Sequence, residues 1–258
     1  MAFVIALSGK GGTGKTTLAA LMVRYISRDL GRTVLAVDAD PNSGLGEALG
    51  VSPERTVADI REDTREERLQ LAPGMSKERQ IEFLIQSSVA EGKRFDLLTM
   101  GRPEGPKCYC YVNNLLRKYL DEATSTYPFV VIDNEAGMEH LSRRTTNNVD
   151  ELFIVSDATL QGARTVARIM KLAGELPIFV KRKEVFLNAI VQGDDAAGFK
   201  SAIRDAGFTI ALSVPHDDEL YRTLAAGKSV FDLPDSSAAV LSVGRFLDKR
   251  IVRDSGKS

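Results

Sequence analysis

The sequence predicts an α/β fold: a single doubly wound, mostly parallel sheet flanked by helices. Short apolar runs alternate along the chain with segments of helical periodicity, a pattern typical of a parallel sheet covered on both faces. The chain has 258 residues, and 43% of them are hydrophobic, which is enough to bury a full core in one domain. We therefore expect one domain over residues 1–252, followed by a flexible tail over 253–258.

The individual elements follow from these periodicities. The apolar runs predict strands at Phe3–Leu7, Thr33–Val37, Phe95–Met100, Phe129–Ile132, Leu152–Val155, Val185–Val191 and Thr209–Val214. Helical spacing predicts one helix directly after the first strand and others over Lys77–Ala90, Asn113–Glu122, Ala163–Ala173, Ala197–Ala206 and Ala238–Arg250. The charged run Arg61–Arg68 is expected to form a solvated helix face or a surface loop.

Charge and composition exclude several classes of protein. A net charge of −1 argues against a broadly basic surface for nucleic acid. No apolar stretch approaches the roughly 18–20 residues that a membrane span needs, and the chain begins with a core strand rather than a signal peptide. We therefore expect a cytoplasmic protein that binds neither nucleic acid nor a membrane. The two cysteines, Cys108 and Cys110, favour metal binding or redox chemistry over a disulfide framework.

A glycine-rich segment joins the first strand to the helix that follows it. This segment reads Gly9-Lys10-Gly11-Gly12-Thr13-Gly14-Lys15-Thr16-Thr17. It fits G-x-x-x-x-G-K-[ST], the phosphate-binding loop, in the required strand–loop–helix context. Glycines let the backbone N–H groups turn inward, and the helix dipole adds positive potential. We expect Lys15 to reach the β- and γ-phosphates of a nucleoside triphosphate and the Thr16 hydroxyl to bind Mg²⁺.

Carboxylates follow two of the predicted strands. Asp38 and Asp40 end the second strand, where one can support the magnesium shell and the other can orient or deprotonate the attacking water. Either could instead cap a helix that begins near Ser43. Asp133 ends the fourth strand, at the position of a magnesium-binding carboxylate. Gly137 follows it and would let the backbone approach the γ-phosphate and move once that phosphate leaves.

These motifs together resemble the deviant Walker A family of dimeric ATPases. The likeness rests on the early Lys10 of the loop, on Asp38-Ala-Asp40-Pro and on Asp133-x-x-Ala-Gly137. That family includes the MinD and ParA positioning ATPases, the nitrogenase iron protein and the Get3-type targeting factors. The resemblance implies a P-loop NTPase subunit that forms a homodimer around two nucleotides. It also implies that Lys10 reaches the partner's nucleotide, that Asp40 activates water and that Asp38 is the first switch carboxylate.

Two later positions match the adenine-binding residues of the same family. Asn188 follows Val185-Phe-Leu187, and Pro215 ends the strand before His216 and Asp217. An Asn amide can both donate to and accept from the edge of a base. Asn and Pro are also ordinary turn residues, so a purely structural role stays open.

The two cysteines lie in one short segment directly before an amphipathic helix. In an extended conformation the side chains of Cys108 and Cys110 point the same way, and thiols near a helix N-terminus have lowered pKa values. Two ligands are too few for a stable metal site, but a twofold dimer would supply four thiolates. Four thiolates suit Zn²⁺, Ni²⁺ or an iron–sulfur cluster. Two structurally incidental cysteines are the alternative.

Within the family, the cysteine pair and the segment from Asp133 to Thr145 closely resemble CooC-type ATPases. These, with the related AcsF, mature nickel enzymes. The resemblance implies ATP hydrolysis coupled to nickel delivery into carbon monoxide dehydrogenase or acetyl-CoA synthase. For His140 four roles stay open: a further metal ligand, a contact with the client enzyme, a residue packed against a helix or a support for the switch segment. The alternatives are a MinD- or ParA-like positioning ATPase and a nitrogenase-like electron donor with a [4Fe–4S] cluster, in which the cysteines lie far apart in sequence.

Overall fold

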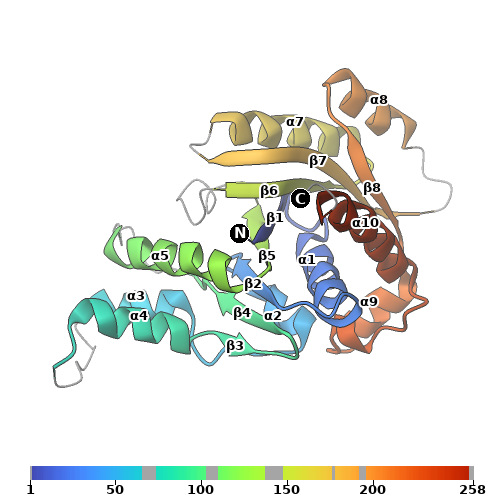
Figure 1. The fold of residues 1–258 in the computed structure, drawn as a ribbon. Helices are drawn as coiled ribbons and strands as arrows, with labels where there is room; N and C mark the ends of the chain where they lie inside the picture. The colour runs from blue at the N-terminus through green and yellow to red at the C-terminus, as the bar shows by residue number, and fades with distance from the viewer. Residues whose placement is uncertain are drawn as a thin grey trace.

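One sheet forms the centre of the computed structural model, which describes residues 2–65, 74–102, 110–136, 148–175, 178–191 and 196–255 (Figure 1). The eight strands of these residues are ordered β3-β4-β2-β5-β1-β6-β7-β8. All neighbouring pairs are parallel except β3 and β4. The predicted fold class is therefore confirmed.

The strands are β1 (Phe3–Gly9), β2 (Val34–Ala39), β3 (Ala90–Glu91), β4 (Phe95–Thr99), β5 (Phe129–Ala136), β6 (Asn148–Ser156), β7 (Phe179–Ile190) and β8 (Ile210–Pro215). The α-helices are α1 (Lys15–Arg24), α2 (Gly44–Leu49), α3 (Val57–Arg65), α4 (Lys77–Ser87), α5 (Cys110–Thr126), α7 (Leu160–Glu175), α8 (Ala197–Asp205), α9 (Asp218–Ala225) and α10 (Ala238–Ser255). A π-helical turn, η1 (Tyr25–Asp29), continues α1, and a 3₁₀ turn, η2 (Val230–Asp232), precedes α10.

Apolar side chains cover both faces of the sheet. Along β1, Val4 and Ala6 join the core formed with α3, α4, α5, α7 and α8, whereas Ile5 and Leu7 join the core formed with α1, α2 and α10. Successive strand residues point to opposite faces, so an unbroken apolar run is what a strand buried on both faces requires. The two helical layers lie on either side of the sheet in Figure 1.

All the predicted strands are present, and the differences have local causes. β7 begins at Phe179 rather than at the predicted Val185. The prediction missed the first half of the strand because its residues alternate between exposed and half-buried and form no apolar run. α9 and β3 were not predicted, and the helix expected over Lys77–Ala90 ends at Ser87, before β3. The charged run expected to form a helix face or a surface loop begins inside α3. Within α3, the expectation that Arg61 is solvated is wrong: its residue is 5% exposed, because Arg61 lies one helical turn after the buried Val57. α10 continues to Ser255, into the segment expected to be a tail, since neither Gly nor Pro occurs between Gly244 and Gly256.

Strand register brings the chemical groups to one edge of the sheet. Asp38 of β2 is the register partner of Asp133 of β5, and β5 also pairs with β1. β1 ends at Gly9, where the glycine-rich loop begins. The loop and both carboxylates therefore meet at the carboxyl ends of adjacent strands, which is where open α/β sheets bind ligands.

Candidate nucleotide site

The glycine-rich loop is closely packed at its two ends and open in its middle. A Cβ on Gly9, whose φ is +151°, would lie 2.2 Å from the carbonyl oxygen of Val155, and one on Gly14, with φ of +88°, would lie 2.3 Å from Nδ2 of Asn188. A Cβ on Gly11 or on Gly12 would meet no atom within 4 Å. α1 starts directly after the loop, with Gly14 as its N-cap, so the loop lies at the N-terminus of a helix, as an anion site requires.

The two lysines of the loop differ in environment. Lys15 is 6% exposed, and its Nζ donates to the carbonyl oxygen of Lys10 at 3.3 Å. The Thr13 hydroxyl donates to the same carbonyl at 2.8 Å, which fixes the loop around it. Lys10 itself is exposed. Lys15 therefore sits inside the loop, within reach of an anion there, whereas the side chain of Lys10 faces outward, as a contact with a second subunit would need.

A hydroxyl and two carboxylates lie beside the loop. Thr16 Oγ1 donates to Oδ2 of Asp133 at 2.6 Å. Oδ1 of Asp133 is buried and has no hydrogen-bond partner within the described residues. Asp38 is fully buried and accepts from the backbone N–H groups of Leu45 at 2.9 Å and of Asp40 at 3.2 Å. Asp38 thus also caps the first turn of α2, so the structural role left open for it is real.

Burial sets the electrostatics of the two carboxylates. It raises the pKa of Asp133 to about 7, against the opposing effect of the hydrogen bond from Thr16; the nearby Asp38 raises it further. Burial likewise raises the pKa of Asp38 to about 6, although the hydrogen bonds from Leu45 and Asp40 oppose the shift. Two buried carboxylates that repel each other, one of them with an oxygen that has no partner among the described residues, suit a hard divalent cation such as Mg²⁺ together with the Thr16 hydroxyl.

Asp40 lies at the rim of this site. It is half-buried, and its Oδ1 accepts from both the backbone N–H and the side-chain amide of Asn42, each at 2.9 Å. Both hydrogen bonds are made to the same carboxylate oxygen. The arrangement orients the carboxylate, and with respect to the described residues its second oxygen stays available to a water molecule or a ligand.

A cavity of about 350 Å³ adjoins the beginning of α1. Its lining is largely apolar and comprises Thr17, Leu18, Asn188, Ala189, Val214, Pro215, His216, Asp217, Leu220, Tyr221, Leu224 and Ala225. Asn188 Nδ2 donates to the carbonyl oxygen of Thr13 at 2.9 Å, so this amide connects the cavity to the loop. The four residues predicted to hold a base therefore line one cavity beside the phosphate loop, with the size and character of a small-molecule site.

Asp217 has a structural role that the sequence motif did not indicate. Its Oδ1 accepts from the N–H groups of Glu219 and Leu220 at the start of α9, and its Oδ2 accepts from Ser237 Oγ and the Ala239 N–H at the start of α10. Burial alone would raise the pKa of this carboxyl, but the hydrogen bonds outweigh it and hold the pKa below its usual value. Its carboxylate is thus committed to two helix caps, and its carbonyl oxygen accepts from the Tyr221 N–H at 3.1 Å.

α9 supplies cavity residues that sequence reasoning missed. Leu220, Tyr221 and Leu224 line the cavity, and α9 has no buried residue although its apolar side chains recur at helical spacing. The available signal was an N-cap Asp followed by two acidic residues and this spacing.

Several predicted residues fall outside the described part of the chain: Gly137, His140 and Cys108. Cys110 is the first residue of α5, and its side chain also lies outside the description. In the part that is described, no group of three or more His, Cys, Asp or Glu residues could hold a metal ion. No helix of that part is both long and apolar enough to cross a membrane.

The chain is similar to known nucleotide-binding proteins over most of its length. The CobQ/CobB/MinD/ParA nucleotide binding domain, CbiA, matches residues 4–230. An uncharacterized ATP-binding protein of Methanocaldococcus jannaschii is 41% identical over 251 residues, covering 96% of this chain and 98% of that protein. The carbon monoxide dehydrogenase accessory protein CooC of Rhodospirillum rubrum is 32% identical over 240 residues, covering 89% of each.

Solved structures give the same result for the fold. A ParA family ATPase from Chlorobium tepidum has a TM-score of 0.73 at 23% identity, over 95% of this chain and 98% of that one. MinD of Aquifex aeolicus has a TM-score of 0.69 at 22% identity, over 100% and 98% of the two chains. The family match and the phosphate loop with its paired carboxylates agree, and the chain belongs to the CobQ/CobB/MinD/ParA family of nucleotide-binding proteins.

Proposed function

We propose that the protein is an ATP-hydrolysing homodimer that carries nickel on Cys108 and Cys110. It would help to insert this nickel into the nickel–iron–sulfur cluster of carbon monoxide dehydrogenase or acetyl-CoA synthase. The observation that carries the proposal is the Cys-x-Cys pair in the sequence, whose second cysteine, Cys110, is the first residue of α5. The 32% identity to a carbon monoxide dehydrogenase accessory protein over 89% of both chains supports it.

The nucleotide part of the proposal follows from the loop. Its backbone N–H groups and Lys15 would neutralise the phosphates, and the cavity beside α1 would take the adenine. Thr16, Asp133 and Asp38 would hold Mg²⁺, directly or through water, because they supply oxygen donors and Asp133 keeps a buried oxygen without a hydrogen bond. Magnesium bound there would offset the negative charge that develops on the transferred phosphoryl group.

Hydrolysis needs an oriented water and a further positive charge. Asp40 is the candidate for orienting or deprotonating the water, because Asn42 fixes its carboxylate through one oxygen. The exposed Lys10 would reach the nucleotide of the partner subunit and act as an arginine finger does, an effect worth roughly 10³–10⁵ in rate. Hydrolysis would then depend on the dimer.

The nickel part rests on ligand number and on topology. Two thiolates from each subunit would make a four-thiolate site at a twofold axis, which suits Ni²⁺ and also Zn²⁺. α5 begins after the chain leaves the carboxyl end of β4, where Thr99 is the register partner of Asp38. The N–H of the next residue, Met100, donates to the Asp38 carbonyl at 2.8 Å. The cysteine pair thus lies in the sequence between the end of this strand, which pairs with β2 of the nucleotide site, and the second residue of α5.

The proposal is tested with purified nickel-free carbon monoxide dehydrogenase, incubated anaerobically with Ni²⁺, MgATP and this protein. We expect faster recovery of carbon monoxide oxidation with the wild type than with Ni²⁺ alone. Neither Cys108→Ser/Cys110→Ser nor Asp40→Asn should accelerate recovery. The same assay with nickel-free acetyl-CoA synthase distinguishes the two clients. If the cysteine variant accelerates recovery as much as the wild type does, nickel is not carried on these thiols.

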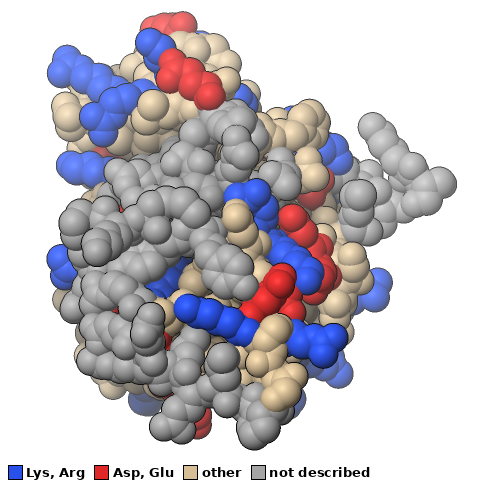
Figure 2. Space-filling view, turned by 90° about the vertical axis from the view of Figure 1, so that its left-hand side faces the viewer, with Lys and Arg blue, Asp and Glu red and all other residues tan. Residues whose placement is uncertain are grey.

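A positioning ATPase of the MinD or ParA kind is the alternative, and two features count against it. The apolar face of α10 is already packed: Leu247 is fully buried, and Arg250 pairs with Glu184 and lies over the ring of Phe246. A membrane-binding helix would need that face. On the described part of the face in Figure 2, basic side chains lie beside acidic ones rather than in a continuous basic stripe. ATP-dependent binding to liposomes or DNA would favour the alternative.

A further inference from the structure

A second hollow lies at the amino end of β4, whereas the phosphate loop lies at the carboxyl end of β1. It has a volume of about 530 Å³ and is lined by Ser27, Arg28, Lys93, Arg94 and Phe231; we call it the basic hollow. Lys93 and Arg94 form the turn between β3 and β4, at the amino end of β4, and Ser27 and Arg28 belong to η1. Its volume lies in the range of small-molecule sites, about 300–1,000 Å³.

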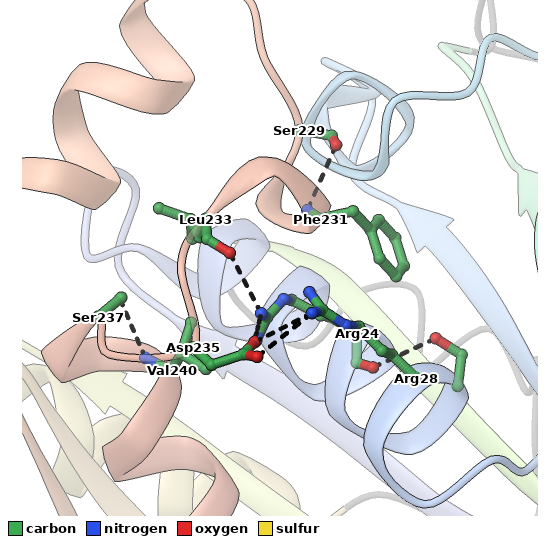
Figure 3. A network of polar contacts seen from close by, with 9 residues as sticks. Arg24, Arg28, Ser229, Phe231, Leu233, Asp235, Ser237 and Val240 are labelled. Atoms are coloured by element: carbon green, nitrogen blue, oxygen red, sulfur yellow. Dashed lines mark hydrogen bonds and ion pairs between the residues drawn. The ribbon is translucent and has the colours of Figure 1, made fainter.

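The hollow carries more positive than negative charge. Arg28 donates to Asp235, but that carboxylate also pairs at 2.6 Å with the buried Arg24 (Figure 3). Two guanidinium groups therefore share one carboxylate. Within the described residues, Lys93 and Arg94 form no ion pair, and both are exposed. Three cationic side chains, from η1 and from the turn before β4, thus border one concave surface, and none of the described residues that line it is a carboxylate.

Local backbone geometry holds this surface in shape. Arg94 adopts a φ of +66°, unusual for a residue with a side chain, and its carbonyl accepts from the Val34 N–H at 3.3 Å. A Cβ on Gly31 would lie 2.9 Å from Arg94 Nη1, so the missing side chain leaves room for the guanidinium. Phe231 stacks on Phe95 with ring centroids 5.4 Å apart, which gives the hollow a packed aromatic wall.

We propose that the basic hollow binds a small multivalent anion, of the class that carries two or more phosphate groups. Three cations around a concave surface can neutralise such a ligand, whereas a single surface lysine cannot hold one against solvent and salt. The site would be separate from the phosphate loop and would exist once in each subunit. It does not depend on the nickel proposal.

The probe is pyrophosphate, titrated calorimetrically at low ionic strength into the Lys15→Ala variant, whose phosphate loop is disabled. We expect one site per chain, weakened at least tenfold when Lys93→Gln and Arg94→Gln are added. The matched control adds Lys200→Gln and Arg204→Gln, which remove one exposed lysine and one exposed arginine of α8 that form no ion pair within the described residues. This control should leave the affinity unchanged.

Two results would overturn the proposal: no pyrophosphate binding to the Lys15→Ala variant, or equal loss of affinity in both double variants. Far-ultraviolet circular dichroism and the melting temperature establish that each variant is folded. ATP hydrolysis by Lys93→Gln/Arg94→Gln in the wild-type background should equal that of the wild type. The pyrophosphate titration therefore tests the basic hollow separately from the proposed ATP hydrolysis.

Discussion

The Thr16 hydroxyl donates to Oδ2 of Asp133 at 2.6 Å and so joins the first turn of α1 to the second half of β5. The other oxygen of Asp133 is buried without a hydrogen-bond partner in the described part of the chain. A buried carboxylate that is half satisfied is costly, and a bound cation removes that cost. The unpartnered oxygen of Asp133 therefore destabilises the ligand-free protein, and a cation bound there would relieve this cost.

That arrangement predicts a pH dependence of stability. The pKa values of Asp133 and Asp38 are raised to about 7 and about 6 in the folded state. A raised folded-state pKa contributes stability at low pH that is lost as the pH rises through the folded value. Without nucleotide and Mg²⁺, the free energy of unfolding should fall by on the order of 2 kcal/mol between pH 5 and pH 8.

Urea denaturation across this pH range measures the effect. The Asp133→Asn variant, which cannot ionise at this position, should lose distinctly less stability over the same interval. Saturating MgADP should also flatten the profile of the wild type, because the ligand stabilises the charged carboxylates. If stability depends on pH equally steeply in the wild type and the variant, Asp133 is not the cause of that dependence.

Replacing Asp40 should separate binding from hydrolysis. Asp40→Asn keeps the size of the side chain and an oxygen that can accept from Asn42, but it removes the charge that orients or deprotonates water. We expect an unchanged dissociation constant for ATP and a loss of turnover of at least about 10²-fold. Phosphate release and nucleotide binding are measured on the same preparation; wild-type turnover would exclude Asp40 from the mechanism.

Replacing Lys10 should act through the dimer. Lys10→Ala removes an exposed side chain. The backbone carbonyl of residue 10 can still accept from Thr13 and Lys15, so the loop should keep its shape. We expect a fall in turnover of about 10³-fold or more, with ATP affinity changed much less. Mixing Lys10→Ala with an Asp40→Asn variant should restore part of the activity, since each mixed dimer keeps one complete site. Weakened ATP binding with normal turnover would argue for a role within one subunit.

Asp235 should be important for stability although it is 69% exposed. It pairs with Arg24, whose residue is 1% exposed and whose Nε lacks a hydrogen-bond partner among the described residues. Asp235→Asn would leave this buried guanidinium without a counter-charge. We expect a loss of about 1–3 kcal/mol in urea denaturation, against less than about 0.5 kcal/mol for Glu54→Gln, an exposed carboxylate with no ion pair among the described residues.

Local motifs predicted the fold and the phosphate loop because their chemistry lies within a few residues. The loop, its strand and its helix are contiguous, and Asp133 stands out as the polar residue at the end of an apolar run. The contacts that complete the site are not local. Thr16 and Asp133 lie 117 positions apart, and Arg24 and Asp235 lie 211 positions apart. Nothing in either segment alone indicates such a partner.

Asp217 illustrates the limit of motif reasoning in the other direction. The family likeness assigned it to the base, and it does line the cavity. Its carboxylate, however, caps α9 and α10 at once, a role that requires both helix ends to meet at one point. The spacing of residues along one chain does not encode that meeting, and α9 itself was not predicted.

An anaerobic titration of the reduced protein with Ni²⁺ tests the central claim most directly. The wild type and the Cys108→Ser/Cys110→Ser variant are compared, and tight sites are counted per chain. We predict about half a nickel per chain in the wild type, with thiolate-to-nickel absorption, and no tight site in the variant. A nickel stoichiometry that does not depend on the cysteines, or no tight site at all, would contradict the proposed function and leave a nucleotide-binding protein with another cargo.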